Sequence, residues 1–253
     1  MMWAFRRMPE DARIETLLCE RTRFCRLVHV VSCVSTQELA AADTQDGDAV
    51  YWADHQTRGR GRQRREWHDE PGADLAVTFR VTAPLPQPLA LPAAVPVAVL
   101  QACQPFAGRR LTIKWPNDVF LDGRKLSGVL IDAGVGNPDT YLIGIGVNCN
   151  RVRFPPDLET VACSLAVATG HEVDRGALLV AIAIQIETLL RDLTLRRHAG
   201  LEAVFRDRLG LMGRRVRVDS AEVHEGVLTG IDFERLVLDG RFAVPLAIVR
   251  AIR

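Results

Sequence analysis

The hydrophobic pattern divides the chain into short strand-like runs interleaved with helical segments. Runs rich in β-branched and aromatic residues predict strands, and apolar residues that recur every three to four positions predict helices. In the first 150 residues, strands are expected at 24–31, 49–53, 75–81, 111–114, 119–121, 124–132 and 141–147. Helices are expected at 35–42, 92–106, 165–168, 174–195 and 201–209. This order of elements indicates a sheet with helices packed on it.

Several boundaries are marked by side chains with strong local preferences. Ser35 and Glu38 have the Ser-x-x-Glu spacing of a capping box, in which each side chain bonds to the first turn of the helix. Asp174 is the expected N-cap of the long helix that follows it. Asp122 and Gly123 can adopt the positive φ of a tight turn, so the residues around them are expected to form a β-hairpin.

From residue 213 onward the pattern changes to short β-like runs at 216–218, 226–231, 236–238 and 244–252, separated by glycines and acidic residues. We expect a small β-barrel of roughly 40 residues, docked on the main body because it is too small to be stable alone. The expected division is therefore a main domain at 1–210 and a small barrel at 211–253. Residues 1–20 are expected to form a tail that leads into a short helix.

The composition suits a globular protein, because 48% of the 253 residues are hydrophobic. A net charge of +1 argues against a surface built for nucleic acid. Residues 1–10 lack the apolar core of a signal peptide, and the most apolar run, 89–100, is short and contains two prolines. We therefore expect a cytoplasmic protein with no membrane partner.

The six cysteines include no C-x-x-C pair and no Cys/His spacing suited to zinc. Free cysteine is among the most buried residue types, and a reducing compartment keeps thiols unpaired. The expectation is six scattered, buried thiols.

The most unusual stretch is Arg58–Glu66, which has five arginines and one glutamate and thus a net charge of +4 in nine residues. Gly59 and Gly61 alternate with the first arginines, and Trp67 follows. No apolar period runs through this stretch, so we expect a flexible loop rather than a packed helix or a half-buried strand. Such a loop can order around an anion through charge-assisted hydrogen bonds. Taken alone, it leaves a phosphate ligand, a nucleic acid and a solvated surface as alternatives.

Lysine is scarce: Lys114 and Lys125 stand against thirty arginines. Lysine is a compact point charge that guanidinium does not replace. Lys114 ends a predicted strand and opens the stretch Lys-Trp-Pro-Asn-Asp, and ligands bind at strand ends in α/β sheets. Asn117 and Asp118 can hold magnesium together with phosphate oxygens. The alternative is a strand that ends in a proline turn with an exposed lysine.

Together these stretches resemble the motifs of the biotin–protein ligase family, in the family's order and over roughly residues 25–250. The matching motifs are Ser35-Thr36-Gln37, Gln56, Gly59-Arg60-Gly61-Arg62 with Arg65 and Trp67, Lys114-Trp115-Pro116-Asn117-Asp118, Arg124-Lys125-Leu126-Ser127-Gly128-Val129-Leu130, and Gly144-Ile145-Gly146-Val147-Asn148.

The resemblance implies an α+β fold: a mixed-sheet catalytic domain with packed helices, similar to class II synthetases, and a C-terminal SH3-like barrel. It also implies a two-step ligase. Biotin and Mg-ATP give biotinyl-5′-AMP and pyrophosphate, and the adenylate then biotinylates a lysine of a biotin carboxyl carrier protein. Because an acyl-adenylate hydrolyses readily, a loop that closes over it would protect it. The resemblance leaves a homodimer open.

The resemblance also implies residue roles. The biotin-binding residues would be Ser35, Thr36, Gln37, Gln56, Arg60, Gly61, Arg62, Lys114 and Gly128. The ATP- or adenylate-binding residues would be Gly59, Arg62, Arg65, Trp67, Asn117 and Asn148. The catalytic cations would be Lys114, Arg62 and Arg60, and the magnesium ligands would be Asn117 and Asp118.

The sequence departs from the family pattern at Gln37, where the family usually has asparagine, and at Arg64, where it usually has glycine. Only about 25 residues precede the first expected strand, too few for the DNA-binding module of some members, so no DNA partner is expected. Two other functions stay open: a lipoate or octanoate ligase or transferase on the same fold, and a nucleic-acid-binding protein that uses the arginine loop.

Overall fold

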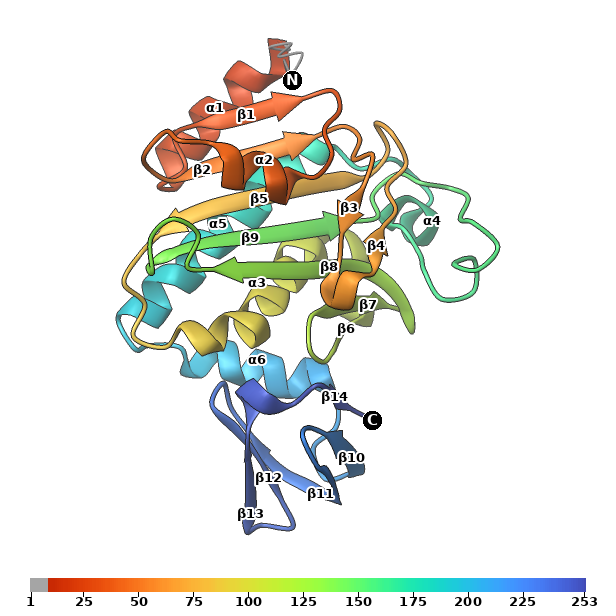
Figure 1. The fold of residues 1–253 in the computed structure, drawn as a ribbon. Helices are drawn as coiled ribbons and strands as arrows, with labels where there is room; N and C mark the ends of the chain where they lie inside the picture. The colour runs from red at the N-terminus through yellow and green to blue at the C-terminus, as the bar shows by residue number, and fades with distance from the viewer. Residues whose placement is uncertain (1–8) are drawn as a thin grey trace.

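The computed structural model describes residues 9–253, and its centre is a seven-stranded mixed sheet (Figure 1). The strand order is β1-β2-β5-β9-β8-β7-β6, in which β1 and β2 are parallel and the other neighbours are antiparallel. The strands are β1 (Leu27–Val30), β2 (Ala49–Ala53), β5 (Leu75–Thr82), β6 (Leu111–Lys114), β7 (Asp118–Leu121), β8 (Arg124–Ala133) and β9 (Thr140–Val147).

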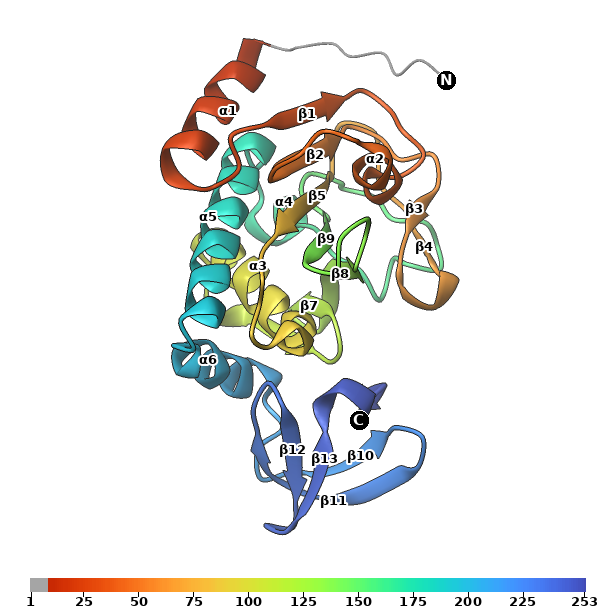
Figure 2. The ribbon, with the colours of Figure 1, turned by 60° about the vertical axis from the view of Figure 1, so that its left-hand side comes forward.

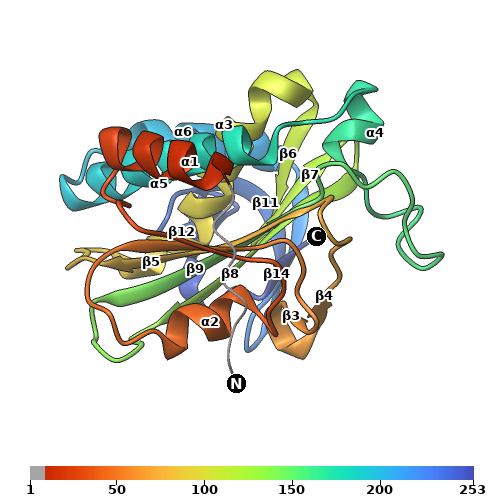
Figure 3. The ribbon, with the colours of Figure 1, turned by 90° about the horizontal axis from the view of Figure 1, so that it is seen from above.

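Helices cover the two faces of this sheet unequally. The view from above shows α1, α3, α5 and α6 on one face, and α2 with the short strands β3 and β4 on the other (Figure 3). The helices are α1 (Pro9–Arg21), α2 (Thr36–Ala42), α3 (Leu91–Ala107), α4 (Leu165–Thr169), α5 (Arg175–Thr194) and α6 (Ala199–Leu209). Figure 2 shows α2, β3 and β4 on the side of the sheet away from α3 and α5.

Most of the expected elements are present within a few residues of their predicted ends. The hairpin between β7 and β8 turns at Asp122 and Gly123, whose φ angles are 50° and 76°. Asp174 caps α5 by accepting a hydrogen bond from the backbone N–H of Ala177. The first expected strand, 24–31, is shortened to Leu27–Val30. The short helix expected before residue 20 is α1, whereas the tail expected at 1–8 lies outside the described residues.

Helix α3 explains the most apolar part of the chain. With the preceding turn it forms a 20-residue segment, Pro88–Ala107, whose length and hydropathy would suffice to cross a membrane. However, 67% of its most apolar window is buried inside the molecule, where α3 packs against α5 and the sheet. Burial in the core therefore accounts for its apolar character.

The C-terminal residues form a second, five-stranded antiparallel sheet below α6 (Figure 1). The run expected as one strand at 244–252 is divided by a 3-10 turn, Leu246–Ile248, so this prediction is wrong. The turn carries the chain from pairing with β12 to pairing with β10, at the opposite edge of the sheet. The strands are β10 (Arg215–Asp219), β11 (Val223–Ile231), β12 (Arg235–Leu238), β13 (Phe242–Pro245) and β14 (Ala251–Ile252).

The cysteines correct another expectation. Cys19 and Cys25 are exposed and joined by a disulfide, so the prediction of six buried free thiols is wrong for this pair. Helix α1 ends at Arg21 and the chain turns back, which places the two Cα atoms 4.2 Å apart. The other four cysteines are buried and free. Burial raises the pKa of Cys33 and of Cys103 to about 12, so these thiols serve packing rather than chemistry.

Candidate active site

One wall of the candidate site is a buried hydrogen-bond network at the start of α2. Ser35 caps the helix and accepts from the backbone N–H of Gln37 at 3.2 Å. The backbone N–H and the hydroxyl of Thr36 both donate to Gln56 Oε1, at 2.8 and 3.2 Å. The Thr78 hydroxyl lies 2.9 Å from Thr36 Oγ1 and 3.0 Å from Gln37 Oε1. The polar residues singled out in the sequence therefore meet, and Thr78, which was not singled out, joins them.

The floor of the site is a trough of small residues that crosses four neighbouring strands. Gly128 on β8 is paired with Gly146 on β9, Gly146 with Ala76 on β5, and Ala76 with Ala53 on β2. Directly paired residues leave the same face of a sheet, so the four positions together form a shallow floor. The Trp67 indole lies on this floor: a Cβ atom added at Gly146 would be 2.3 Å from its Cε2 atom.

The arginine loop forms a two-stranded ribbon, which corrects the expectation of a loop without strands. Strands β3 (Gly59–Arg60) and β4 (Glu66–Trp67) pair antiparallel, and the Gly61 N–H donates to the Arg65 carbonyl at 2.8 Å. The ladder is only two residues long on each side, too short to produce an apolar period. We call residues 57–68 the lid, because they lie over the same sheet face as α2 (Figure 3).

The two ends of the lid are joined at its base. The Asp69 carboxylate accepts from the backbone N–H of Gln56, with its oxygens at 3.1 and 3.3 Å, and lies 3.1 Å from His55 Nδ1. A second clamp lies beside it, because Arg151 donates to the His68 carbonyl and pairs with Asp74 at 2.7 Å. These contacts hold the base of the lid while its tip projects over the trough.

The cationic end of the site contains Arg62 from the lid and Lys125 from β8. Lys125 Nζ lies 2.8 Å from Asp118 Oδ1 and 5.8 Å from the centre of the Trp67 ring. Burial of the Arg62 guanidinium lowers its pKa, and the charge of Asp118 partly offsets this effect. Two cations thus lie near one carboxylate, in a place where an incoming anion would be attracted.

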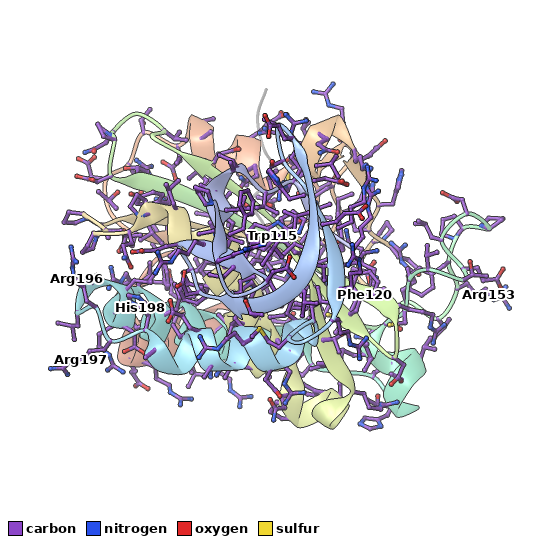
Figure 4. All side chains as sticks on the ribbon, turned by 90° about the horizontal axis from the view of Figure 1, so that it is seen from below. Trp115, Phe120, Arg153, Arg196, Arg197 and His198 are labelled. Carbon is purple, nitrogen blue, oxygen red and sulfur yellow. A yellow bond between two sulfur atoms is a disulfide. The ribbon has the colours of Figure 1, made fainter. Side chains whose placement is uncertain are left out.

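Lys114, the main catalytic cation expected from the resemblance, lies at the edge of the site. Its partner in the β6–β7 ladder is Asp118, so both side chains leave the same face of the sheet. The side chain is nevertheless exposed, and its Nζ lies 5.0 Å from the centre of the Phe120 ring, which is labelled in Figure 4. Of the two lysines, Lys125 is the one in contact distance of the lid residue Trp67.

The other lid arginines face carboxylates on the rim of the site. Arg60 Nη1 lies 3.4 Å from Asp132 Oδ2. The Arg58 guanidinium lies 4.0 Å from Glu38, which was expected to close a capping box. Arg65 is exposed and contributes its backbone to the turn of the lid. The side chain of Arg64, whose effect on the lid was in question, lies outside the described part of the structure.

The three residues expected to bind ATP or metal beyond the lid are largely engaged with the protein backbone. Asn117 Nδ2 donates to the Val129 carbonyl at 2.7 Å, and Asn148 Nδ2 donates to the carbonyls of Lys125 and Cys163. Asp118 is paired with Lys125. Among the described residues, no group of three or more His, Cys, Asp or Glu side chains could hold a metal ion. Magnesium binds asparagine through the side-chain oxygen, which the Nδ2 hydrogen bond of Asn117 does not occupy, so the magnesium role expected for Asn117 and Asp118 stays a prediction.

The assembled site has three distinct parts. A wall of buried hydroxyls and amides can bind a small polar ring, and two cations can bind a phosphate. Between them lies the trough of small residues, whose Gly128 and Gly146 positions the Trp67 indole covers, so a ligand there would displace or adjoin the indole. The half-buried Trp67 indole is an aromatic surface of the kind on which a planar base stacks. Such a site suits a molecule with a polar head, a linear body and an anionic end.

Sequence reasoning missed Lys125, Thr78, Asp69 and Asp132 as parts of this site. Lys125 could have been predicted from the sequence, because it is one of two lysines and belongs to a recognised motif. The other three gave no signal, since an aspartate or a threonine within a strand or loop is common. Their roles depend on partners 13 to 95 positions away in the chain.

Comparison with known proteins agrees with this geometry. A family model described as the biotin/lipoate A/B protein ligase family matches residues 20–150, which are more than half of the chain and include α2, the lid and strand β8. The chain belongs to this family. The capped α2, the lid and the glycine floor all lie within the matched stretch.

Three similar proteins illustrate the relationship. The bifunctional ligase/repressor BirA of Bacillus subtilis is 34% identical over 164 residues, which are 62% of this chain and about half the length of that protein. A biotin–[acetyl-CoA-carboxylase] ligase of Paracoccus denitrificans is 31% identical over 231 residues, covering 84% of this chain and 94% of that protein. The structure of Aquifex aeolicus biotin protein ligase in complex with biotin and ATP superposes with a TM-score of 0.80 at 24% identity, over 91% of this chain and 99% of that one. This last likeness shows that the α+β fold is shared.

Proposed function

We propose that this protein is a biotin–protein ligase, which activates biotin with ATP and transfers it to a lysine of a biotin carboxyl carrier protein. The observation that carries the proposal is the position of Arg62 and Lys125 beside Asp118, at one end of a glycine-floored trough whose other end is the hydroxyl and amide wall. The Paracoccus ligase supports it, because the match covers nearly all of that protein.

The first step joins two anions, which explains the need for cations. A carboxylate oxygen of biotin attacks the α-phosphorus of ATP, the bond to the β-phosphate oxygen breaks, and pyrophosphate leaves. Arg62 and Lys125 would screen the repulsion between the two anions and stabilise the charge that develops on the phosphorus oxygens. Lys125 can bind such a phosphate by exchanging its ion pair with Asp118 for one with the ligand, and Arg62 would bind from the lid.

The second step transfers the acyl group. The neutral ε-amine of a carrier lysine attacks the acyl carbon of biotinyl-5′-AMP, AMP leaves, and the amine loses a proton. Until the carrier binds, the closed lid would keep water from the mixed anhydride. The base of the lid is clamped, so opening for the lysine would be a movement of the segment beyond these clamps.

The wall and Trp67 fit the two ends of the adenylate. Biotin's ring system carries a urea group, whose oxygen and N–H groups need hydrogen-bond partners when buried. Ser35, Thr36 and Gln56 can provide donors and acceptors for it. The adenine base can stack on the Trp67 indole. Asn117 and Asp118 would hold magnesium together with the nucleotide phosphates, where the ion would screen phosphate charge, and we assign no step to it.

The test is biotin-dependent exchange between ATP and pyrophosphate. We expect exchange in the native protein and its loss by about 10²- to 10³-fold in Arg62→Ala, the usual effect of removing one group that stabilises transition-state charge. Arg58→Ala is the matched control, because Arg58 is an exposed lid arginine 4.0 Å from Glu38 and is expected to matter little. Exchange that requires lipoate instead of biotin would establish the alternative ligase, and no exchange with either acid would overturn the proposal.

A further inference from the structure

Asp132 connects the lid to the wall of the pocket. It lies near the end of β8, and a single carboxylate oxygen, Oδ2, is 3.2 Å from Gln37 Nε2 and 3.4 Å from Arg60 Nη1. Gln37 belongs to α2 and Arg60 to the lid, so one acidic side chain joins two elements that are distant in the sequence. None of the motifs recognised in the sequence includes this aspartate.

Through this oxygen, Asp132 also fixes the orientation of the Gln37 amide. The Nε2 atom donates to Asp132 and to the Leu142 carbonyl at 3.3 Å, while Oε1 accepts from Thr78 at 3.0 Å. If the amide were flipped, its oxygen would face two acceptors and its nitrogen a hydroxyl, and the bonds to Asp132 and Leu142 would be lost. Gln37 is buried and covers Gly144, where an added Cβ would lie 3.0 Å from Oε1.

The lid lies along β8 between two carboxylates. Arg60 faces Asp132, and the charge of Asp118, which pairs with Gly128 across the β7–β8 ladder, acts on Arg62. Positions 128 and 132 are four residues apart on one strand, about 13 Å at the usual rise per residue. The lid carries a net charge of +4 between Arg58 and Glu66, so without ligand its closure depends on such negative partners.

We propose that Asp132 is a positioning residue that latches the lid. Its carboxylate holds Arg60 over the pocket and at the same time orients the Gln37 amide in the wall beneath. The position of the lid and the orientation of the wall are therefore linked through one side chain, so a change at Asp132 affects both. The structural part of this proposal is independent of the reaction, whereas its effect on biotin binding rests on the proposed function.

The structural part is tested by hydrogen–deuterium exchange of the unliganded protein. The variant is Asp132→Asn, which can still accept from Gln37 but loses its charge toward Arg60. We expect the lid amides, including the Gly61 N–H that bonds to Arg65, to exchange about two- to five-fold faster, the range for a partly exposed ion pair. Raising NaCl from about 0.05 to 0.5 M should speed lid exchange more in the native protein than in the variant, because the variant lacks one of the charged pairs that salt screens.

Two further variants control this experiment. Asp122→Asn removes a carboxylate that pairs with Arg110 at the other end of β8, and its lid is expected to exchange as in the native protein. Asp132→Glu keeps the charge and should retain the salt dependence. If the lid amides of Asp132→Asn exchange at the same rate as those of Asp122→Asn and respond equally to salt, the latch proposal is overturned. If Asp132→Asn unfolds, a lid in Asp132→Glu that has lost its salt response overturns the latch as well.

A kinetic measurement separates the latch from the proposed function. In the exchange assay, Asp132→Asn should raise KM for biotin by about two- to five-fold and leave kcat nearly unchanged, because the latch affects binding and not the attack on phosphorus. A two- to five-fold fall in kcat with an unchanged KM for biotin would contradict a positioning role. If the native protein shows no biotin-dependent pyrophosphate exchange, the proposed function fails. Hydrogen–deuterium exchange of the lid still tests the latch in that case.

Discussion

At the scale of single residues, the site depends on which of two similar side chains points into it. Lys114 and Lys125 both lie at the same end of the sheet, yet Lys114 is exposed over Phe120 and Lys125 pairs with Asp118 beneath Trp67. A partly buried cation that is already close to a carboxylate has lost some of its hydration, so it interacts more strongly with an anion than an exposed one does. The catalytic role expected for Lys114 stays a prediction, and Lys125 is its stronger competitor.

Comparing the two lysines gives the first prediction at this scale. Lys125→Ala should lower biotin-dependent pyrophosphate exchange by about 10²- to 10³-fold, and Lys114→Ala by less than about tenfold. Circular dichroism and thermal unfolding of both variants would establish that each is folded. A Lys114→Ala variant as inactive as Lys125→Ala would show that the site extends across Phe120 to the edge of the sheet.

At the scale of elements, α1 and β1 are held to the sheet by a charge network on the face opposite the site. His29 stacks on Trp52 and lies 2.7 Å from Asp11 on α1 and 3.4 Å from Asp54 after β2. Arg175 at the start of α5 pairs with Asp54 at 3.0 Å. Burial lowers the pKa of His29, but its hydrogen bonds to the two aspartates outweigh burial, so the pKa of His29 is raised.

This network predicts a pH-dependent stability. Because the folded pKa of His29 exceeds its unfolded value of about 6.5, its charged pairs stabilise the protein fully below that value and lose their effect as pH rises through the folded pKa. His29→Gln should lower the free energy of unfolding by about 1–3 kcal/mol at pH 6 and by less at pH 9. Urea unfolding at the two pH values measures the difference.

A matched control for this measurement is His171→Gln. His171 is exposed in the segment between α4 and α5, so the free energy of unfolding should change by less than about 0.5 kcal/mol at both pH values. If His29→Gln lost the same stability at pH 6 and pH 9, the effect would come from packing on Trp52 and not from the charge of His29.

At the scale of the whole molecule, Trp115 links the candidate site to the small C-terminal sheet. Its Nε1 donates to the Val249 carbonyl at 3.0 Å, and its ring meets Phe205 of α6 edge-on. Figure 4 places Trp115 behind the ribbon of the small sheet, far from Arg153 on the outlying segment before α4. The residue lies between Lys114 and Asn117, so the turn that ends β6 is also the docking point of the small sheet. The division of the chain into domains at residue 210 stays a prediction.

Removing the hydrogen bond of Trp115 should lower the stability of the protein measurably. Trp115→Phe keeps an aromatic ring but leaves the buried Val249 carbonyl without this donor, so unfolding should become easier by about 1–3 kcal/mol. Thermal unfolding with tryptophan fluorescence and calorimetry would report the loss. An unchanged midpoint would mean that the small sheet is held mainly by other contacts, such as the ring pair of Phe205 and Phe233.

The sequence by itself determined the elements and the chemical types gathered in the site. Capping, turn and periodicity signals act within a few residues, so α2, the β7–β8 hairpin and α5 could be predicted from residues such as Ser35, Gly123 and Asp174. The motifs also predicted that a polar wall and a cationic lid would occur in one chain, because each motif is a short contiguous run.

Only the tertiary structure decided which side chains meet. Strand pairing places Gly128, Gly146, Ala76 and Ala53 in one row, a register that no local pattern encodes. The same pairing turns Lys125 toward the lid and brings Asp132 to Gln37, 95 positions away in the chain. Such contacts depend on the order of strands in the sheet. In that order β9, which is buried along its whole length, is the central strand between β5 and β8, a position that follows from packing of the whole sheet.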